Sequence, residues 1–102
     1  MEKKPDTYAF RLFITGASPN SAKAVANIRQ ICETYLKGNY TLEIVDVYQQ
    51  REIAEKEQLI ALPLLIKKYP LPVRRLIGDL SDKQKVLTEL GIYSDLEQQT
   101  KI

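Results

Sequence analysis

The chain has 102 residues, of which 44% are hydrophobic and 27% charged, and a formal net charge of +2. These values exclude a disordered chain and predict one folded domain over residues 1–102, with flexible ends at 1–6 and 97–102. With one cysteine, no histidine and no long apolar run, the sequence excludes an internal disulfide and disfavours a metal site, a membrane span and a secretion signal, so a cytoplasmic protein is expected.

The first half of the chain predicts a strand, a long helix and a second strand. Residues 7–14 alternate with apolar positions on both sides, which suits a strand covered on both faces. Ser18 can cap the following helix, Pro19 suits its first position, and Gly38 can end it. Residues 40–48 form a second β-rich run, so a parallel strand–helix–strand unit is expected.

The second half predicts a short helix and then two short strands. Residues 51–59 have short-helix character. Pro63 prevents a helix from passing through the next apolar run. Residues 64–67 and 73–77 are therefore expected to be strands, joined by a proline-rich turn at 69–72.

A final helix is predicted to begin after Ser81, which has the spacing of a capping box with Gln84. Its expected buried stripe is Val86, Leu87, Leu90 and Tyr93. The complete order is strand, helix, strand, helix, strand, strand, helix. With a proline before the third strand, this α/β order (β-α-β-α-β-β-α) is the thioredoxin-like arrangement.

Thioredoxin-like enzymes carry reactive cysteines in the loop after the first strand, at a helix N-terminus that favours a thiolate. Residues 15–20 occupy this loop here and contain no cysteine. Cys32 lies more than three turns into the helix on its apolar side, where a buried structural thiol is expected. A thiol protein that uses Cys32 alone with an external thiol stays as an alternative. The loop also lacks the glycine spacing and lysine of a phosphate loop.

Asp46 and a basic stretch later in the chain are two further candidates for a functional site. Asp46 lies between two valines near the end of a strand, where pairing with a lysine or arginine is expected over a raised pKa. Between Gln58 and Gly78 there is no acidic residue, and the charges are those of Lys67, Lys68, Arg74 and Arg75. Residue types alone indicate a solvated edge strand protected by charge and proline. Nucleic-acid binding is disfavoured because Tyr69 is the only aromatic residue in this stretch.

From about residue 8 to residue 90 the chain resembles the KaiB family of cyanobacterial clocks and their bacterial relatives. Its order and spacing of motifs carry the resemblance. The motifs are Gly16, Pro19-Asn20-Ser21, Ile44-Val45-Asp46-Val47, Ala61, Pro63-Leu64, Pro70, Pro72-Val73-Arg74-Arg75 and Ile77-Gly78-Asp79-Leu80-Ser81-Asp82.

The resemblance implies a regulator without catalysis or cofactor that binds the N-terminal ATPase ring of a KaiC-like hexamer and modulates its phosphorylation and ATPase cycle or output. The partner-binding residues it implies are Lys67, Pro70, Pro72, Arg74 and Arg75. Family members also displace a sensor histidine kinase, SasA, whose N-terminal domain is itself similar, so a free sensory-type domain that binds a kinase is a second alternative. Glu43 stands where clock members usually carry lysine, which puts KaiA in doubt as a partner.

The family further implies two folds, a thioredoxin-like monomer and a resting dimer or tetramer in which the C-terminal half is rearranged. The implied fold-switch segment contains Gly78, Asp79, Ser81, Asp82, Glu89 and Gly91. The chain has Glu89-Leu90-Gly91 where members typically have Gly-Leu-Asp. Glutamate favours a helix interior and glycine favours a helix end, so we expect the equilibrium between the two folds to lie modestly further toward the thioredoxin-like state than in the clock relatives.

Overall fold

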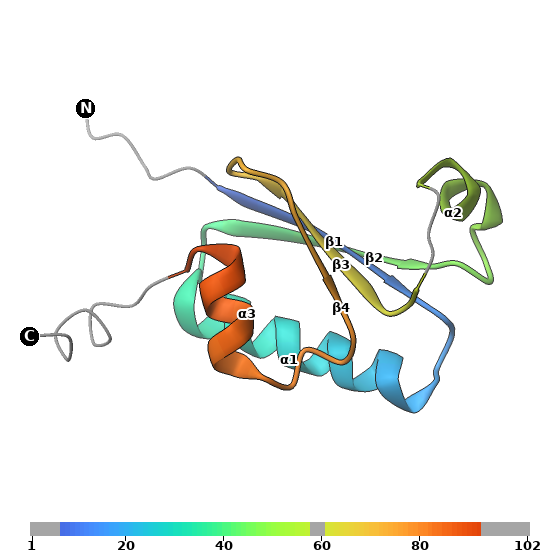
Figure 1. Ribbon diagram of the computed structural model, residues 1–102, viewed down its shortest axis with the longest axis horizontal. Helices are drawn as coiled ribbons and strands as arrows, with labels where there is room; N and C mark the ends of the chain where they lie inside the picture. Colours follow the sequence, from blue (N-terminus) through green and yellow to red (C-terminus); the bar gives the residue numbers. More distant parts are fainter. Residues whose placement is uncertain (1–6, 58–60, 93–102) are drawn as a thin grey trace, which may run out of the picture.

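The computed structural model describes residues 7–57 and 61–92. Strands and helices follow one another in the predicted thioredoxin-like order (Figure 1). They are β1 (Tyr8–Ile14), α1 (Pro19–Tyr35), β2 (Tyr40–Asp46), α2 (Arg51–Glu57), β3 (Leu64–Tyr69), β4 (Arg74–Ile77) and α3 (Lys83–Leu90). The thioredoxin-like prediction is therefore confirmed. The resting topology implied by the family resemblance stays a prediction.

The four strands form one mixed sheet in the order β2-β1-β3-β4. β1 pairs in parallel with β2, as expected for a strand–helix–strand unit. β3 runs antiparallel to β1, and β4 runs antiparallel to β3. β2 and β4 are consequently the two edges of the sheet, and the proline-rich turn joins β3 to the edge strand β4.

Two hydrophobic clusters lie on opposite faces of the sheet. α1 and α3 cover one face, and α2 lies toward the other, near the end of β2 (Figure 1). The larger cluster joins both covering helices to the sheet through residues that include Phe10, Leu12, Ile28, Leu65 and Leu87. The smaller cluster is Phe13, Val45, Leu64 and Ile66, with Ile53 of α2 packed against it. The predicted two-sided burial of the first strand follows from this arrangement.

α1 begins as the sequence predicts. The Ser18 side chain accepts a hydrogen bond from the backbone amide of Ser21, and Pro19 occupies the first turn, where a missing N–H costs nothing. The helix ends at Tyr35, and Gly38 follows with a φ of 75°. Left-handed backbone of this kind is readily adopted by glycine, so the chain can turn into β2.

The start of α3 differs from the prediction by one residue. Asp82, not Ser81, caps the helix by accepting a hydrogen bond from the amide of Lys85. The reason is that the Asp79 side chain accepts from the Ser81 amide at 3.0 Å, which holds Ser81 in the preceding turn. Val86, Leu87 and Leu90 are buried as expected, whereas Tyr93 lies outside the described residues.

Candidate partner-binding surface

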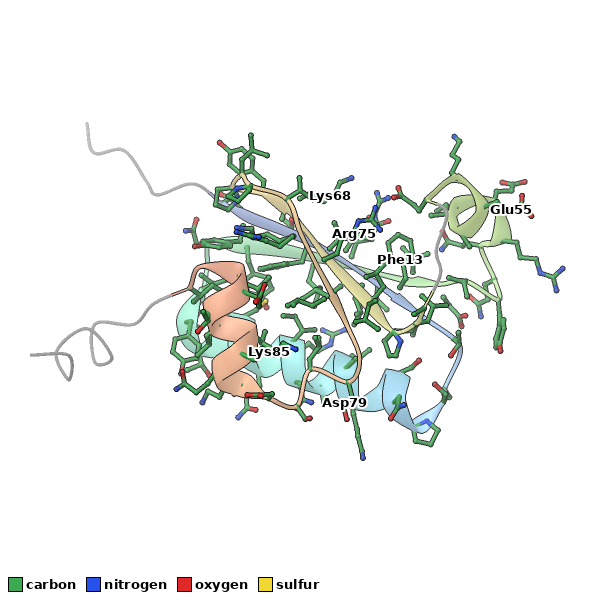
Figure 2. The ribbon with its side chains drawn as sticks, in the orientation of Figure 1. Phe13, Glu55, Lys68, Arg75, Asp79 and Lys85 are labelled. Carbon is green, nitrogen blue, oxygen red and sulfur yellow. The ribbon has the colours of Figure 1, made fainter. Side chains whose placement is uncertain are left out.

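An exposed turn and strand edge bring most of the predicted partner-binding residues together. We call residues Lys68, Tyr69, Pro70, Leu71, Pro72, Val73, Arg74 and Arg75 the basic turn. All are exposed to solvent except Pro70, which is half-buried. The basic turn contains three cationic side chains and no acidic one. Figure 2 shows Lys68 and Arg75 near the paired strands β3 and β4, toward the middle of the view.

Apolar side chains are exposed alongside these charges. Leu71 is 70% exposed and Val73 52%, and Tyr69 is also exposed. Ile77, just beyond the basic turn on β4, is 66% exposed. An exposed set of apolar side chains among charged ones is typical of a protein interaction site. Sequence reasoning missed these residues, although apolar residues between closely spaced prolines were a signal that they could not be buried in a regular element.

Arg74 and Arg75 point to opposite faces of the sheet, because successive residues of a strand alternate. Arg74 is directly opposite Lys67 and Arg75 directly opposite Ile66 in the β3–β4 ladder. Arg74 therefore shares its face with α3, whereas Arg75 shares its face with the smaller cluster. A single partner that contacts both guanidinium groups has to reach around the edge of the sheet.

Lys67 is separated from the other predicted partner-binding residues by its burial. Its side chain is covered, with only 4% of the residue exposed, so it is not part of a solvated edge as residue types had indicated. The Nζ atom donates a hydrogen bond to the Leu90 carbonyl at 3.3 Å and lies 6.0 Å from the centre of the Tyr8 ring. Burial first, and the nearby Arg74 second, lower the pKa of Lys67 from its ordinary value. In this fold Lys67 anchors the end of α3 to the sheet.

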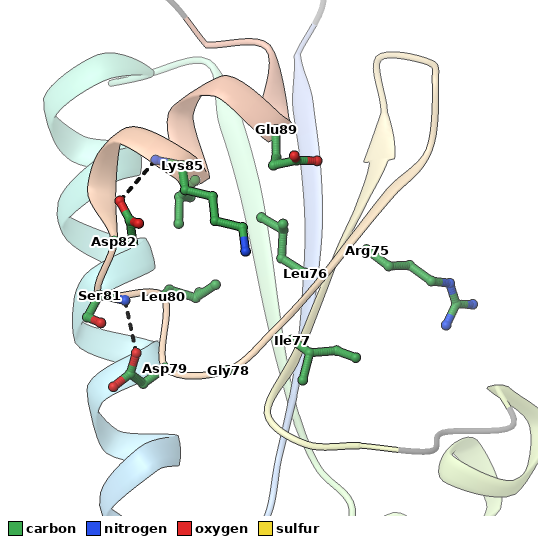
Figure 3. Close-up of a pocket in the computed structure, with 11 residues that line it drawn as sticks. Arg75, Leu76, Ile77, Gly78, Asp79, Leu80, Ser81, Asp82, Lys85 and Glu89 are labelled. Atoms are coloured by element: carbon green, nitrogen blue, oxygen red, sulfur yellow. Dashed lines mark hydrogen bonds between the residues drawn. The ribbon is translucent and has the colours of Figure 1, made fainter.

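The predicted fold-switch residues lie along the connection from β4 into α3 and at the end of that helix (Figure 3). Gly78 has a φ of 116° and leads into the turn in which Asp79 binds Ser81. Hydrogen bonds from Ser81 lower the pKa of the Asp79 carboxyl group. Gly91 caps α3 in the left-handed conformation with a φ of 71°, and Glu89 is exposed within the last helical turn. The expected placement of Glu89 inside the helix and Gly91 at its end is confirmed.

A hollow of about 460 Å³ lies between β4 and α3. Residues 75–82 form one side, and Lys85, Val86 and Glu89 of α3 form the other. We call this hollow the edge groove. All the fold-switch residues except Gly91 line this groove together with Arg75 of the basic turn.

Backbone amides in the loop after β1 donate hydrogen bonds to side chains of the same protein. Asp46 accepts from the amides of Gly16 at 3.1 Å and Tyr48 at 2.9 Å. The expected pairing of Asp46 with a lysine or arginine is wrong, because its carboxylate satisfies backbone amides at the ends of β1 and β2 instead. Ser21 is fully buried and its Oγ accepts from the Thr15 amide, which ties α1 to the same loop.

Cys32 is fully buried, as expected for a structural thiol. Burial, with a smaller effect from Glu33, raises the pKa of the Cys32 thiol to about 12. The thiolate is the reactive form, so this sulfur is protonated and covered at neutral pH. The geometry gives no support to a thiol protein based on Cys32.

Glu43, the residue that departs from the clock pattern, belongs to a small charged cluster on the sheet. Arg11 lies opposite Glu43 in the β1–β2 ladder and donates to it at 2.8 Å. Arg11 also reaches Glu57 of α2 at 3.5 Å. The negative charge at position 43 is thus engaged with a cation of the neighbouring strand.

Residues 7–57 and 61–92 contain neither a candidate metal site nor a membrane-spanning helix. No group of three or more cysteine or acidic side chains in these ranges could hold a metal ion. The helices described there include none that is long and apolar enough to cross a membrane.

The fold and the loop after β1 define a thioredoxin-like domain without the cysteines of a thiol enzyme. The family model of the KaiB domain matches residues 11–92. A circadian clock oscillator protein KaiB from Prochlorococcus marinus (strain MIT 9312) is 45% identical over 89 residues, which is 87% of this chain and 85% of that protein. The chain belongs to the KaiB family.

Solved structures agree with the fold. The N-terminal domain of SasA from Synechococcus elongatus superposes with a TM-score of 0.66 at 22% identity, covering 88% of this chain and 89% of that domain. The germline-specific thioredoxin Deadhead from Drosophila melanogaster gives a TM-score of 0.67 at 13% identity, covering 84% of this chain and 80% of that protein. At these identities the likeness concerns the fold alone.

Proposed function

We propose that the protein is a KaiB-type regulator that binds the N-terminal ATPase ring of a KaiC-like hexamer through the basic turn and modulates its phosphorylation and ATPase cycle or output. The observation that carries this proposal is the composition of the basic turn. Cationic and apolar side chains are exposed together there, and no acidic residue interrupts them. Arginine can pair with carboxylates in a bidentate manner, while apolar neighbours exclude water from the pair.

Of the residues implied by the family resemblance, Pro70, Pro72, Arg74 and Arg75 belong to this proposed surface. Lys67 takes part indirectly, because it holds the end of α3 beneath Arg74. A sensor histidine kinase, which the chain would bind as a free sensory-type domain, is a second proposed partner. Self-association to a dimer or tetramer is also proposed, with the exposed apolar residues Leu71, Val73 and Ile77 available for it.

The test is a binding measurement with the KaiC-like protein of the same organism. Replacing both arginines (Arg74→Ala with Arg75→Ala) should weaken binding at least about 30-fold, because charged pairs desolvated in an interface cost about 2 kcal/mol or more to lose. The matched control replaces Lys23 and Arg29 by alanine, since both are exposed on α1 and remove the same charge. Equal effects of the two double substitutions would show a general charge effect and contradict the proposed surface.

A further inference from the structure

β4 leaves one edge of the sheet open for a further strand. Gly78 donates its amide to the Pro63 carbonyl at 3.0 Å, so this pair is bonded across the β3–β4 ladder. Bonded and non-bonded pairs alternate along an antiparallel ladder. Counting back from Gly78, Leu76 and Arg74 also bond toward β3, whereas Arg75 and Ile77 direct their backbone N–H and C=O groups away from it.

These outward groups remain available in the part of the chain that the structure describes. No hydrogen bond from a loop, turn or side chain in residues 7–57 and 61–92 reaches the backbone of Arg75 or Ile77. Both residues are exposed, and β4 pairs with β3 along its whole length. Such an edge is a template for strand addition.

The edge groove supplies a place for side chains of an added strand. Leu76, Leu80 and Val86 are each at most 9% exposed and give the groove an apolar floor. Figure 3 shows Leu76 and Leu80 directed into the space between β4 and α3, with the Lys85 amine at its border. Every second side chain of a strand laid along β4 would enter this groove, and those in between would lie beside Arg75 on the opposite face.

The charges beside β4 indicate which kind of partner strand fits this edge. A second copy of this chain, paired edge to edge through β4, would offer Arg75 an arginine or an isoleucine but no carboxylate, because β4 contains no acidic residue. Arg75 points away from the groove and favours a partner that places carboxylates on that face of the sheet. The acids at the groove include Asp79 and Asp82, whose carboxylates accept from the amides of Ser81 and Lys85, and Glu89 on the α3 side.

We propose that the open edge of β4 binds an extended acidic segment of a partner protein, which joins the sheet as a fifth strand and places alternate apolar side chains in the edge groove. This site is separate from the proposed ring contact, although Arg75 belongs to both. It requires backbone pairing at Arg75 and Ile77, which the ring proposal does not use.

The test uses acetylated and amidated hexapeptides of alternating glutamate and valine. In the proposed pose, glutamates lie opposite Arg75 and Ile77 and bond to them through their backbone, while valines enter the edge groove. The parent peptide should bind saturably and shift the amide NMR signals of Arg75 and Ile77 most. N-methylation of the glutamates should weaken binding about ten-fold or more, since it removes the N–H groups that pair with β4. N-methylation of the valines should change it little.

Two further binding measurements separate the contribution of charge from that of backbone hydrogen bonding. A peptide with lysine in place of glutamate should bind at least about ten-fold more weakly. On the protein, Ile77→Pro removes an outward N–H without removing a hydrogen bond to β3, and it should abolish the parent peptide's binding, whereas Ile77→Val should keep it. Absence of saturation at millimolar peptide, equal binding of the two N-methylated peptides, or largest NMR shifts away from β4 would each overturn the proposal. Ring binding by Ile77→Pro stays intact if the two sites are separate, and its loss would overturn that separation.

Discussion

Replacing Lys67 by methionine should stabilise the thioredoxin-like fold. Lys67 carries its ammonium group beneath α3 with only 4% of the residue exposed. Its polar contact is the Leu90 carbonyl at 3.3 Å, and no carboxylate of the described residues forms an ion pair with it. Methionine keeps most of the buried aliphatic part of the lysine side chain and fills a similar volume without a charge.

The magnitude follows from three opposing contributions. Loss of the hydrogen bond to Leu90 costs about 1.5 kcal/mol, because the donor is charged but the distance is long. Loss of the cation near the C-terminal end of α3 and beside the Tyr8 ring costs about 0.5 to 1 kcal/mol more. Relief of ammonium desolvation gains several kcal/mol. Burial lowers the pKa of Lys67, so its surroundings disfavour the charged form relative to water, which acts in the same direction as this gain. We expect a net stabilisation of about 1 kcal/mol.

Urea unfolding of the parent and Lys67→Met proteins at several pH values measures this difference. Between the lowered pKa of Lys67 and its ordinary value of 10.5, the unfolded chain binds more protons at this residue than the native protein does. The stability that Lys67 contributes therefore rises with pH across this window, and the advantage of methionine should shrink. A methionine variant that is less stable than the parent at pH 7, or an advantage that does not change up to pH 10.5, would refute this reasoning.

Three further predictions concern the switch segment, the loop after β1 and the thiol. Restoring the common family pattern with Glu89→Gly and Gly91→Asp should lower the thioredoxin-like population in NMR spectra, since a left-handed aspartate costs about 1 kcal/mol; a higher population would contradict the assignment of this segment. Asp46→Ala should lower the free energy of unfolding by about 2 kcal/mol because two amides lose their acceptor, and Asp46→Asn should cost less; equal stability of the parent and alanine proteins would exclude this role. Cys32 should react with a disulfide reagent at pH 8 only as fast as the protein unfolds, since its pKa is about 12; rapid stoichiometric reaction of the folded protein would disprove the burial argument.

The order of elements could be predicted because each boundary has a local signal. Ser18 and Pro19 begin α1 with their own side chains, and Gly91 ends α3 through its left-handed backbone. The alternation of apolar residues in 7–14 predicted the strand that became β1, and Pro63 indicated that no helix continues from α2 into β3. None of these signals depends on a residue far away in the chain.

The candidate site could be predicted less well because its properties come from distant residues. Lys67 resembles any edge lysine in the sequence, and its burial arises from α3, which is reached more than fifteen residues later. Asp46 meets Gly16 across thirty positions, so no local pattern indicates that bond. The choice of Asp82 over Ser81 as the cap depends on how Asp79 holds the preceding turn. By contrast, the opposite orientations of Arg74 and Arg75 follow from the strand period alone.

The bond between Asp46 and the Gly16 amide has a consequence for restoring enzyme activity to this fold. A thioredoxin-like enzyme needs an electropositive neighbourhood that stabilises a thiolate. Here a carboxylate already occupies the amide next to the helix start, at 3.1 Å from the Gly16 nitrogen. Cysteines engineered into residues 15–20 would meet a resident negative charge, which disfavours a second anion beside it. Introducing cysteines alone would therefore give a slowly reacting thiol. A redox enzyme would also require the removal of Asp46, and with it the contact that joins the ends of β1 and β2 would be lost.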